Sequence, residues 1–381
     1  MTLITYLTRV HFADNVLEDA IRLELETAGI RRPLVAGDGA AQRPELTDRL
    51  LAALPIEVDA TLHGATAGVL TEADARIALA LYRQNACDGL IAFGCGAVID
   101  FAKAIRVLVA HDGPLARYAV CEGGSGRIRP ERLPPMIAVP TTAGSGSEAG
   151  PEATLLGEDG RQLTLFSRAL IPTAAICDPT LTLSLPPTAT AETGMEALTH
   201  CIETFIAASY NPPADGIAYD GVSRAAHSLE GAVLRGDDLT ARREMMAAAL
   251  NGALAFQKGL GAVHASSHAL ASETAGASTG PSHGALNAVM LPHVLAFNAP
   301  AVGERVAALG RALRLPSGSD VPEALATLND RLGLPAGLGA MGVTPGAIER
   351  AAPLAERDRH NSTNPRRARA ADYARLMRAA L

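Results

Sequence analysis

The sequence predicts an α/β domain built on a mostly parallel sheet, followed by a second, helical domain. In the first half of the chain, short apolar runs alternate with stretches of helical periodicity, as in strand–helix–strand units. After residue 187 the strand-like runs largely end, and Ala and Leu recur with Met, His and Glu at helical spacing. A length of 381 residues also favours two domains over one.

Four short apolar runs are predicted to be buried parallel strands, because each is followed by turn-forming residues. They cover residues 32–37, 90–94, 136–139 and 174–177, and predicted helices cover 72–86 and 98–110. The pair Pro186-Pro187 marks the predicted boundary between the domains. We therefore expect an α/β domain over residues 1–185 and a helical domain over residues 186–381.

Composition narrows the class of protein. The formal net charge of −7 disfavours a nucleic-acid partner, which selects basic surfaces. The most apolar stretch, residues 89–110, contains Asp100, Lys103 and Arg106, so we predict no membrane span. Five scattered cysteines without a CxxC pair indicate reduced thiols and a cytoplasmic location.

A glycine turn follows the predicted strand 90–94. Gly94 and Gly96 allow a tight turn, and Ala97 lies at the start of the next predicted helix. The N–H groups at such a helix start suit a pyrophosphate, and Asp100 is expected in the first helical turn. Taken alone, this pattern is more typical of a structural turn than of a ligand site.

A second polar turn, residues 140–148, follows the strand predicted over 136–139. It combines glycines with the hydroxyls of Thr141, Thr142 and Ser145, which suit phosphates and a ribose. The alternative is a polar loop with a capping box into the next helix. Two such turns at successive strand ends favour a dinucleotide site.

Asp38 follows the first predicted strand. A carboxylate there would accept hydrogen bonds from the adenosine ribose and favour NAD over NADP. The alternative is an ordinary aspartate in a turn.

Four further residues have the chemistry of metal ligands. Glu196 and His200 are four residues apart, so on a helix they share one face, although that face could simply meet water. His264 and His283 follow later in the chain, with His268 four residues after His264. A lone histidine is more often a packed or capping residue. One carboxylate and several neutral imidazoles together favour a divalent metal ion with an open coordination position.

The ordered set of these motifs resembles the iron-containing (group III) alcohol dehydrogenase family. The resemblance covers most of the chain and is more specific than any single motif. Besides the two turns and the histidines, the motifs are Cys177-Asp178-Pro179, residues 194–203, residues 281–284 with Asn287, residues 291–294, and Thr363-Asn364-Pro365-Arg366.

The resemblance implies a Rossmann-like dinucleotide-binding domain followed by a helical metal-binding domain, the dehydroquinate synthase-like architecture. It assigns Glu196, His200, His264 and His283 to Fe(II) or Zn(II), and places His268 beside the substrate. It also implies a homodimer. In this sequence Glu196 stands where the family usually has Asp, and the stretch between His268 and His283 is longer than usual, with 272–280 as the extra loop.

The function that follows is hydride transfer between NAD, with NADP as the alternative cofactor, and a small alcohol or aldehyde. His268 would relay a proton. Three alternatives stay open at this point. They are a metal-independent reductase similar to maleylacetate reductase, a lyase similar to dehydroquinate synthase, and an inactive relic that binds nucleotide without turnover.

Overall fold

The computed structural model describes residues 4, 6, 8–37, 43–64, 70–274 and 280–381. The chain divides into two compact units. The α/β unit contains Tyr6–Thr142 and Ser147–Thr182, and the helical unit contains Ala143–Gly146 and Leu183–Leu381.

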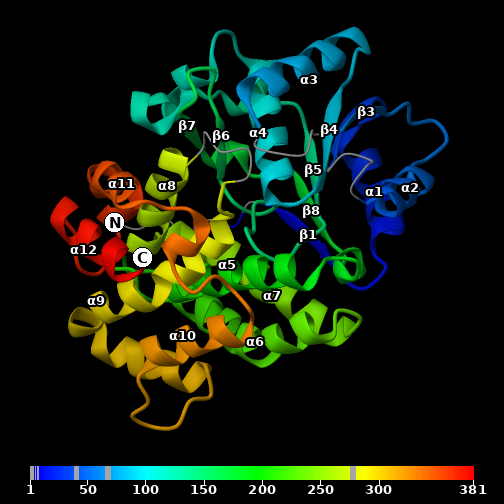
Figure 1. Cartoon of the computed structure of the whole chain (residues 1–381). Helices are drawn as coiled ribbons and strands as arrows, with labels where there is room; N and C mark the ends of the chain where they lie inside the picture. Colours follow the sequence, from blue (N-terminus) through cyan, green and yellow to red (C-terminus); the bar gives the residue numbers. More distant parts are fainter. Residues whose placement is uncertain (1–3, 5, 7, 38–42, 65–69, 275–279) are drawn as a thin grey trace. The chain divides into compact units, whose positions relative to one another are not determined.

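The α/β unit is built on a six-stranded parallel sheet with the strand order β1-β8-β5-β4-β2-β3 (Figure 1). Side chains of opposite parity along the strands enter two separate apolar clusters, one packed against α3 and α4 and the other against α1 and α2. Both faces of the sheet are therefore covered, as a parallel sheet requires. The strands are β1 (Arg9–Phe12), β2 (Pro33–Gly37), β3 (Thr61–Gly64), β4 (Gly89–Gly94), β5 (Met136–Pro140) and β8 (Ala174–Cys177), and the helices are α1 (Leu17–Ala28), α2 (Pro44–Ala53), α3 (Glu72–Gln84) and α4 (Gly96–Ala110).

The four strands and two helices predicted from the sequence are confirmed as β2, β4, β5, β8, α3 and α4. Edge strands β1 and β3 escaped prediction because they are only four residues long and are partly exposed. An antiparallel hairpin, β6 (Glu152–Leu156) and β7 (Gln162–Phe166), was also missed. Its signal was present in the sequence, because polar and apolar residues largely alternate in Glu-Ala-Thr-Leu-Leu and Gln-Leu-Thr-Leu-Phe on either side of an Asp159-Gly160 turn.

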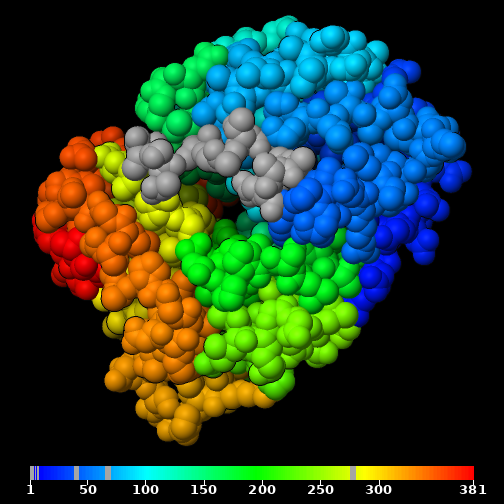
Figure 2. Space-filling model, turned by 45° about the vertical axis from the view of Figure 1, so that its right-hand side comes forward, coloured from blue at the N-terminus to red at the C-terminus, as the bar shows by residue number. Residues whose placement is uncertain are grey.

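In the second unit, helices are the main element and no strand occurs among the described residues, as predicted. It contains α5 (Pro187–Ile206), α6 (Pro212–Leu234), α7 (Leu239–Ala255), α8 (Ala262–Thr274), α9 (His283–Ala312), α10 (Val321–Arg331), α11 (Pro345–Arg357) and α12 (Ala370–Ala379). The segments after α9, coloured orange to red, form part of the surface of this unit in Figure 2. Among the described helices, α9 alone is long and apolar enough to cross a membrane. However, 67% of its most apolar window is buried inside the protein, as in a core helix.

Two cations, of which Lys258 is buried, fix the C-terminal end of α5. The Nζ atom of Lys258, whose side chain is fully buried, donates to the carbonyls of Thr204 and Phe205 at 2.9 Å each. Asp215 accepts from the same ammonium at 2.5 Å and from the guanidinium of Arg305 at 3.1 Å. Cations at a helix C-terminus satisfy its last carbonyls and its dipole, so α5 is held firmly within its unit.

The central strand β4 should carry much of the stability of the α/β unit. Ile91 on β4 is fully buried, whereas Ile77 on α3 is 58% exposed. We expect Ile91→Ala to lower the free energy of unfolding by about 2–5 kcal/mol, because it removes buried methyl groups and leaves a cavity. Ile77→Ala should change it by less than about 0.5 kcal/mol. Equal shifts in urea unfolding would contradict the placement of β4 in the core.

Candidate metal centre and cofactor turns

Helix α5 brings Glu196 and His200 to one face, one turn apart, as predicted. His200 is only 5% exposed, so the alternative in which this face meets water is wrong. The short segment Ala143–Gly146 packs beside it. A Cβ atom built on Gly144 would lie 3.0 Å from Oε2 of Glu196 and 2.9 Å from the carbonyl of Thr193. Only glycine lets the backbone approach the Glu196 carboxylate this closely.

The four histidines singled out from the sequence form one cluster within the helical unit. His264 and His268 lie on α8, and His283 is the first residue of α9. Ring centroids of His200 and His264 are 4.6 Å apart, and the His283 ring lies 5.3 Å from both His264 and His268. Residues from three helices, separated by more than 80 positions in the sequence, therefore meet at one point.

A buried carboxylate that was not predicted orients His264. Nδ1 of His264 lies 2.6 Å from Oε2 of Glu203, which is 1% exposed and also accepts from the N–H of Val263 at 2.7 Å. Burial raises the pKa of Glu203 to about 7. Burial, together with the neighbouring imidazoles, holds the pKa of His264 well below its ordinary value.

The ring of His264 is therefore neutral at pH 7, with its Nδ1 proton directed at Glu203. Its Nε2 keeps a lone pair on the other side of the ring. A carboxylate behind an imidazole is the arrangement that fixes a metal-ligating histidine in one tautomer. The donor set and the orientation of the neutral His264 ring fit a divalent ion.

Two further residues of the site were missed in the sequence. His360, on the 3₁₀ helix η9 (Arg359–Ser362), is 5% exposed, and its ring lies 5.4 Å from His268 and 5.9 Å from His264. Asp358 accepts from Nδ1 of His268 at 3.0 Å and from the N–H of His360 at 2.8 Å. Burial alone would raise the pKa of Asp358, but His268 and His360 hold it well below its usual range. The only sequence signal was proximity to the motif 363–366.

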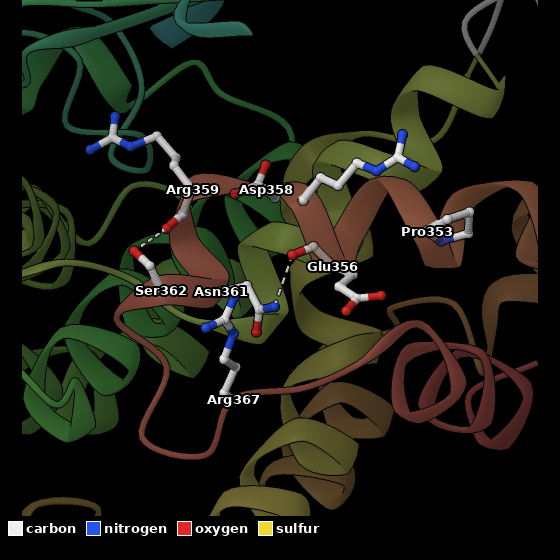
Figure 3. A pocket seen from close by; sticks show the side chains of 8 residues that line it. Pro353, Glu356, Asp358, Arg359, Asn361, Ser362 and Arg367 are labelled. Atoms are coloured by element: carbon white, nitrogen blue, oxygen red, sulfur yellow. Dashed lines mark hydrogen bonds between the residues drawn. The ribbon is translucent and has the colours of Figure 1, made fainter.

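A pocket of about 530 Å³ lies beside this segment (Figure 3). Two of its carboxylates are already engaged, Asp358 with His268 and Glu356 with the N–H of Ala370. The pocket is therefore lined by charged side chains and shares Asp358 with the surroundings of His268. It is lined by Pro353, Glu356, Arg357, Asp358, Arg359, Asn361, Ser362 and Arg367.

The long stretch between His268 and His283 is partly helical. Helix α8 continues to Thr274, so the expectation of a loop from residue 272 is wrong for residues 272–274. Residues 275–279 lie outside the described part of the chain.

The first glycine turn lies where it was predicted. Gly94 ends β4, Gly96 is the first residue of α4, and Ala97 follows it. Cys95 occupies the N-cap without a side-chain cap bond, and the first turn contains no acidic residue. Thr141 donates its N–H to the carbonyl of Gly94 at 3.0 Å, so this turn lies beside the start of the second one.

The expectation that Asp100 lies in the first turn of α4 is wrong, because the helix begins at Gly96. Its carboxylate accepts from Oγ of Ser147 at 2.5 Å and from the N–H of Thr154 at 3.0 Å. Fully buried Lys103 donates to the same Ser147 oxygen at 2.7 Å and to the carbonyl of Gly150 at 3.0 Å. Asp100 and Lys103 thus bind residues 147–154 to α4.

The remaining predicted cofactor residues do not all belong to the same unit. Thr141 and Thr142 belong to the α/β unit, whereas Ser145 belongs with the helical unit. Asp38 lies outside the described residues. The alternative in which residues 140–148 cap a following helix is wrong, because the next element is strand β6.

Together, these features define a class of protein. Glycine turns at the carboxyl ends of a parallel sheet, with a helical unit that gathers imidazoles and a carboxylate, are typical of dehydrogenases that combine a dinucleotide with a metal. The iron-containing alcohol dehydrogenase model matches residues 8–179, and the C-terminal model of the Fe-containing alcohol dehydrogenase family matches residues 190–381. The chain belongs to the iron-containing alcohol dehydrogenase family.

Individual relatives agree with this assignment. The chain is 45% identical to 4-hydroxybutyrate dehydrogenase of Cupriavidus necator over 381 residues, 99% of each chain. It is 33% identical to the NAD-dependent methanol dehydrogenase of Bacillus methanolicus over 311 residues, 79% of each chain. A solved 1,3-propanediol oxidoreductase superposes with a TM-score of 0.91 at 28% identity, covering 100% of both chains.

The predicted family, fold class and enzyme class are therefore confirmed. The protein is an oxidoreductase that acts on CH–OH groups. The lyase, the metal-independent reductase and the inactive relic are not favoured.

If Glu203 orients His264 for a metal, Glu203→Gln should weaken divalent-metal binding about 10–100-fold, because an amide is a poorer partner for the Nδ1 proton. The control is Glu230→Gln, since Glu230 is 42% exposed and pairs with Arg331 on the surface. Zn²⁺ titration with competing chelators, together with circular dichroism, measures the affinity and the fold. Unchanged affinity in a folded Glu203→Gln protein would contradict this role.

Proposed function

We propose that this enzyme is an NAD-linked, metal-dependent alcohol dehydrogenase, and that its substrate pair is 4-hydroxybutyrate and the corresponding semialdehyde. The buried cluster of His200, His264 and His283 beside Glu196 carries the proposal. The name of the relative with 45% identity over 99% of each chain supports the substrate, and the NAD-dependent methanol dehydrogenase supports the cofactor.

Glu196, His200, His264 and His283 would hold Fe(II) or Zn(II), because three neutral imidazoles and one carboxylate suit either ion. An ion held there supplies Lewis-acid stabilisation to the substrate oxygen. The protein contributes the orientation of its ligands. Glu203 fixes the His264 ring, and the close approach of Gly144 leaves the Glu196 carboxylate beside bare backbone.

NAD, when bound, would supply the hydride acceptor or donor of the reaction. Gly94, Gly96 and Ala97 would receive its pyrophosphate at the start of α4, with Thr141, Thr142 and Ser145 as further contacts. Asp38 would favour NAD over NADP. Asp100 would act indirectly, because its carboxylate already binds Ser147 and Thr154.

His268 would relay the proton that the alcohol loses or gains. Asp358 holds Nδ1 of its ring at 3.0 Å, which fixes the tautomer and directs Nε2 away from Asp358. The His268 ring also lies 5.3 Å from the ring of His283, a proposed metal ligand. A proton acceptor would therefore lie beside the proposed metal site.

The residues 1–185 and 186–381 would act as the cofactor-binding and metal-binding domains. We further propose a cytoplasmic homodimer without membrane or nucleic-acid partners. Its five cysteines form no disulfide with one another, which fits a reducing compartment.

The first test is metal content and turnover in one preparation purified without chelator. We expect about one Fe or Zn per chain and NADH oxidation with succinate semialdehyde that a chelator abolishes and added metal restores. Glu196→Ala should lose both metal and activity. Turnover that persists in metal-free protein would instead indicate a metal-independent reductase.

His268→Ala should lower kcat about 100-fold and flatten the pH dependence near neutral pH, because the relay is lost while the metal is retained. His227→Ala is the matched control, since His227 is exposed and contacts Arg314 on the surface. Metal analysis of both variants separates loss of the relay from loss of the ion. Full activity of metal-loaded His268→Ala protein across the pH range would exclude the relay.

A further inference from the structure

A buried asparagine lies beside two of the proposed metal ligands. Asn287 is fully buried on α9, four residues after His283, so the two side chains lie on one face of the helix. Its Nδ2 atom also lies 3.5 Å from Nε2 of His264 on α8, the ring atom whose lone pair is left for an ion. Helical spacing and a contact between two helices therefore both place the Asn287 amide at the proposed metal site.

The neighbours of Asn287 fix the orientation of its amide. Oγ of Ser267, which is fully buried, donates to Oδ1 of Asn287 at 2.6 Å. The proton of the neutral His264 ring is on Nδ1, which faces Glu203, so Nε2 can only accept a hydrogen bond. The reverse orientation would bring the amide oxygen against this acceptor. The amide therefore presents its NH₂ group, and no oxygen, to the proposed metal site.

The NH₂ group of Asn287 lacks a good acceptor. Within the described part of the chain, Nε2 of His264 is the single hydrogen-bonding neighbour of Nδ2, and 3.5 Å is long for such a bond. When the lone pair of His264 goes to an ion, this acceptor is lost as well. A buried donor without an acceptor is costly, so the NH₂ group needs an oxygen atom beside the ion.

A hydrogen-bond donor cannot bind a cation, but it stabilises negative charge on an oxygen atom. In aldehyde reduction, the carbonyl oxygen gains negative charge as hydride adds to its carbon. An N–H that is already oriented toward that oxygen lowers the barrier, because nothing has to reorganise as the charge develops. The substrate oxygen is therefore the acceptor that fits the Asn287 amide.

We infer that Asn287 donates an N–H to the substrate oxygen and stabilises its negative charge, in addition to the proposed ion. The inference rests on the proposed metal-dependent dehydrogenase activity. Ser267 acts as the positioning residue that keeps the NH₂ group directed at the site.

The experiment compares the wild type with Asn287→Ala, Asn287→Asp and Ser267→Ala. Zn²⁺ titration against a competing chelator gives the metal affinity. In the zinc-loaded proteins, NADH fluorescence measures the binding of succinamate, an unreactive amide analogue of succinate semialdehyde, and steady-state kinetics give kcat for the semialdehyde. Asn329→Ala is the control, because Asn329 is a buried asparagine that donates to the carbonyl of Ala288 on α9 at 2.7 Å. Thermal unfolding reports on the fold of each protein.

We expect Asn287→Ala to lower kcat about 100-fold and to weaken succinamate about tenfold, because a donor to the substrate oxygen is lost. Zinc should bind at least as tightly as to the wild type. Asn287→Asp should tighten zinc but weaken succinamate further, because a carboxylate attracts the ion and repels the substrate oxygen. Ser267→Ala should show a smaller loss than Asn287→Ala. Asn329→Ala should bind zinc and succinamate like the wild type.

Three results would overturn the inference. Unchanged succinamate binding and kcat in folded, zinc-loaded Asn287→Ala protein would exclude the contact with the substrate oxygen. Weaker zinc binding by both Asn287 variants would make the residue a support of the metal ligands. Equal losses in Asn329→Ala protein would reduce the effect to the packing of α9. A wild type that binds no zinc, or that reduces the semialdehyde equally well without metal, would instead refute the proposed function, and with it this role of Asn287.

Discussion

The contact between the buried carboxylate of Glu203 and the imidazole of His264 is the interaction on which the rest of the site depends. Both side chains are almost completely removed from water, at 1% and 2% exposure. A carboxylate at that depth is costly unless it is hydrogen-bonded, and Glu203 accepts from the His264 ring and from the N–H of Val263. The same contact holds the ring of His264, a proposed metal ligand, in one orientation.

Helix α5 connects this local contact to the rest of the site. It carries Glu196, His200 and Glu203 on successive turns of one face, so the orienting carboxylate and two proposed ligands move as one body. Its C-terminal end is fixed by Lys258 and Arg305. These contacts supply the rigid support that a metal site needs to hold its geometry.

The start of α9 completes the cluster through a close backbone contact. A Cβ atom on Gly284 would lie only 2.2 Å from the carbonyl of Glu192 on α5, so glycine is required where α9 meets α5. His283, the residue before it, is thereby brought within 5.3 Å of the His264 ring. The close approach of α9 to α5 therefore depends on the glycine next to His283.

Much of this arrangement could be predicted from the sequence. Helical spacing predicted that Glu196 lies beside His200 and His264 beside His268. Short apolar runs predicted buried strands such as β4 and β5. Glu203 and Asp358 could not be found in this way, because they act through partners 61 and 90 positions away in the sequence. Asp100 was misplaced by one helical turn, because α4 begins at Gly96, two residues before the start of the predicted helix.

The most direct test of this account is X-ray absorption at the metal edge of the holoenzyme loaded with one equivalent of Fe(II) or Zn(II). We expect a coordination sphere dominated by three imidazole nitrogens with about one carboxylate oxygen, at roughly 2.0–2.2 Å for zinc. We also expect His264→Ala to remove one of the three imidazoles. A shell of carboxylates and water alone, or one unchanged by His264→Ala, would contradict the claim that the buried Glu203–His264 pair builds the metal centre.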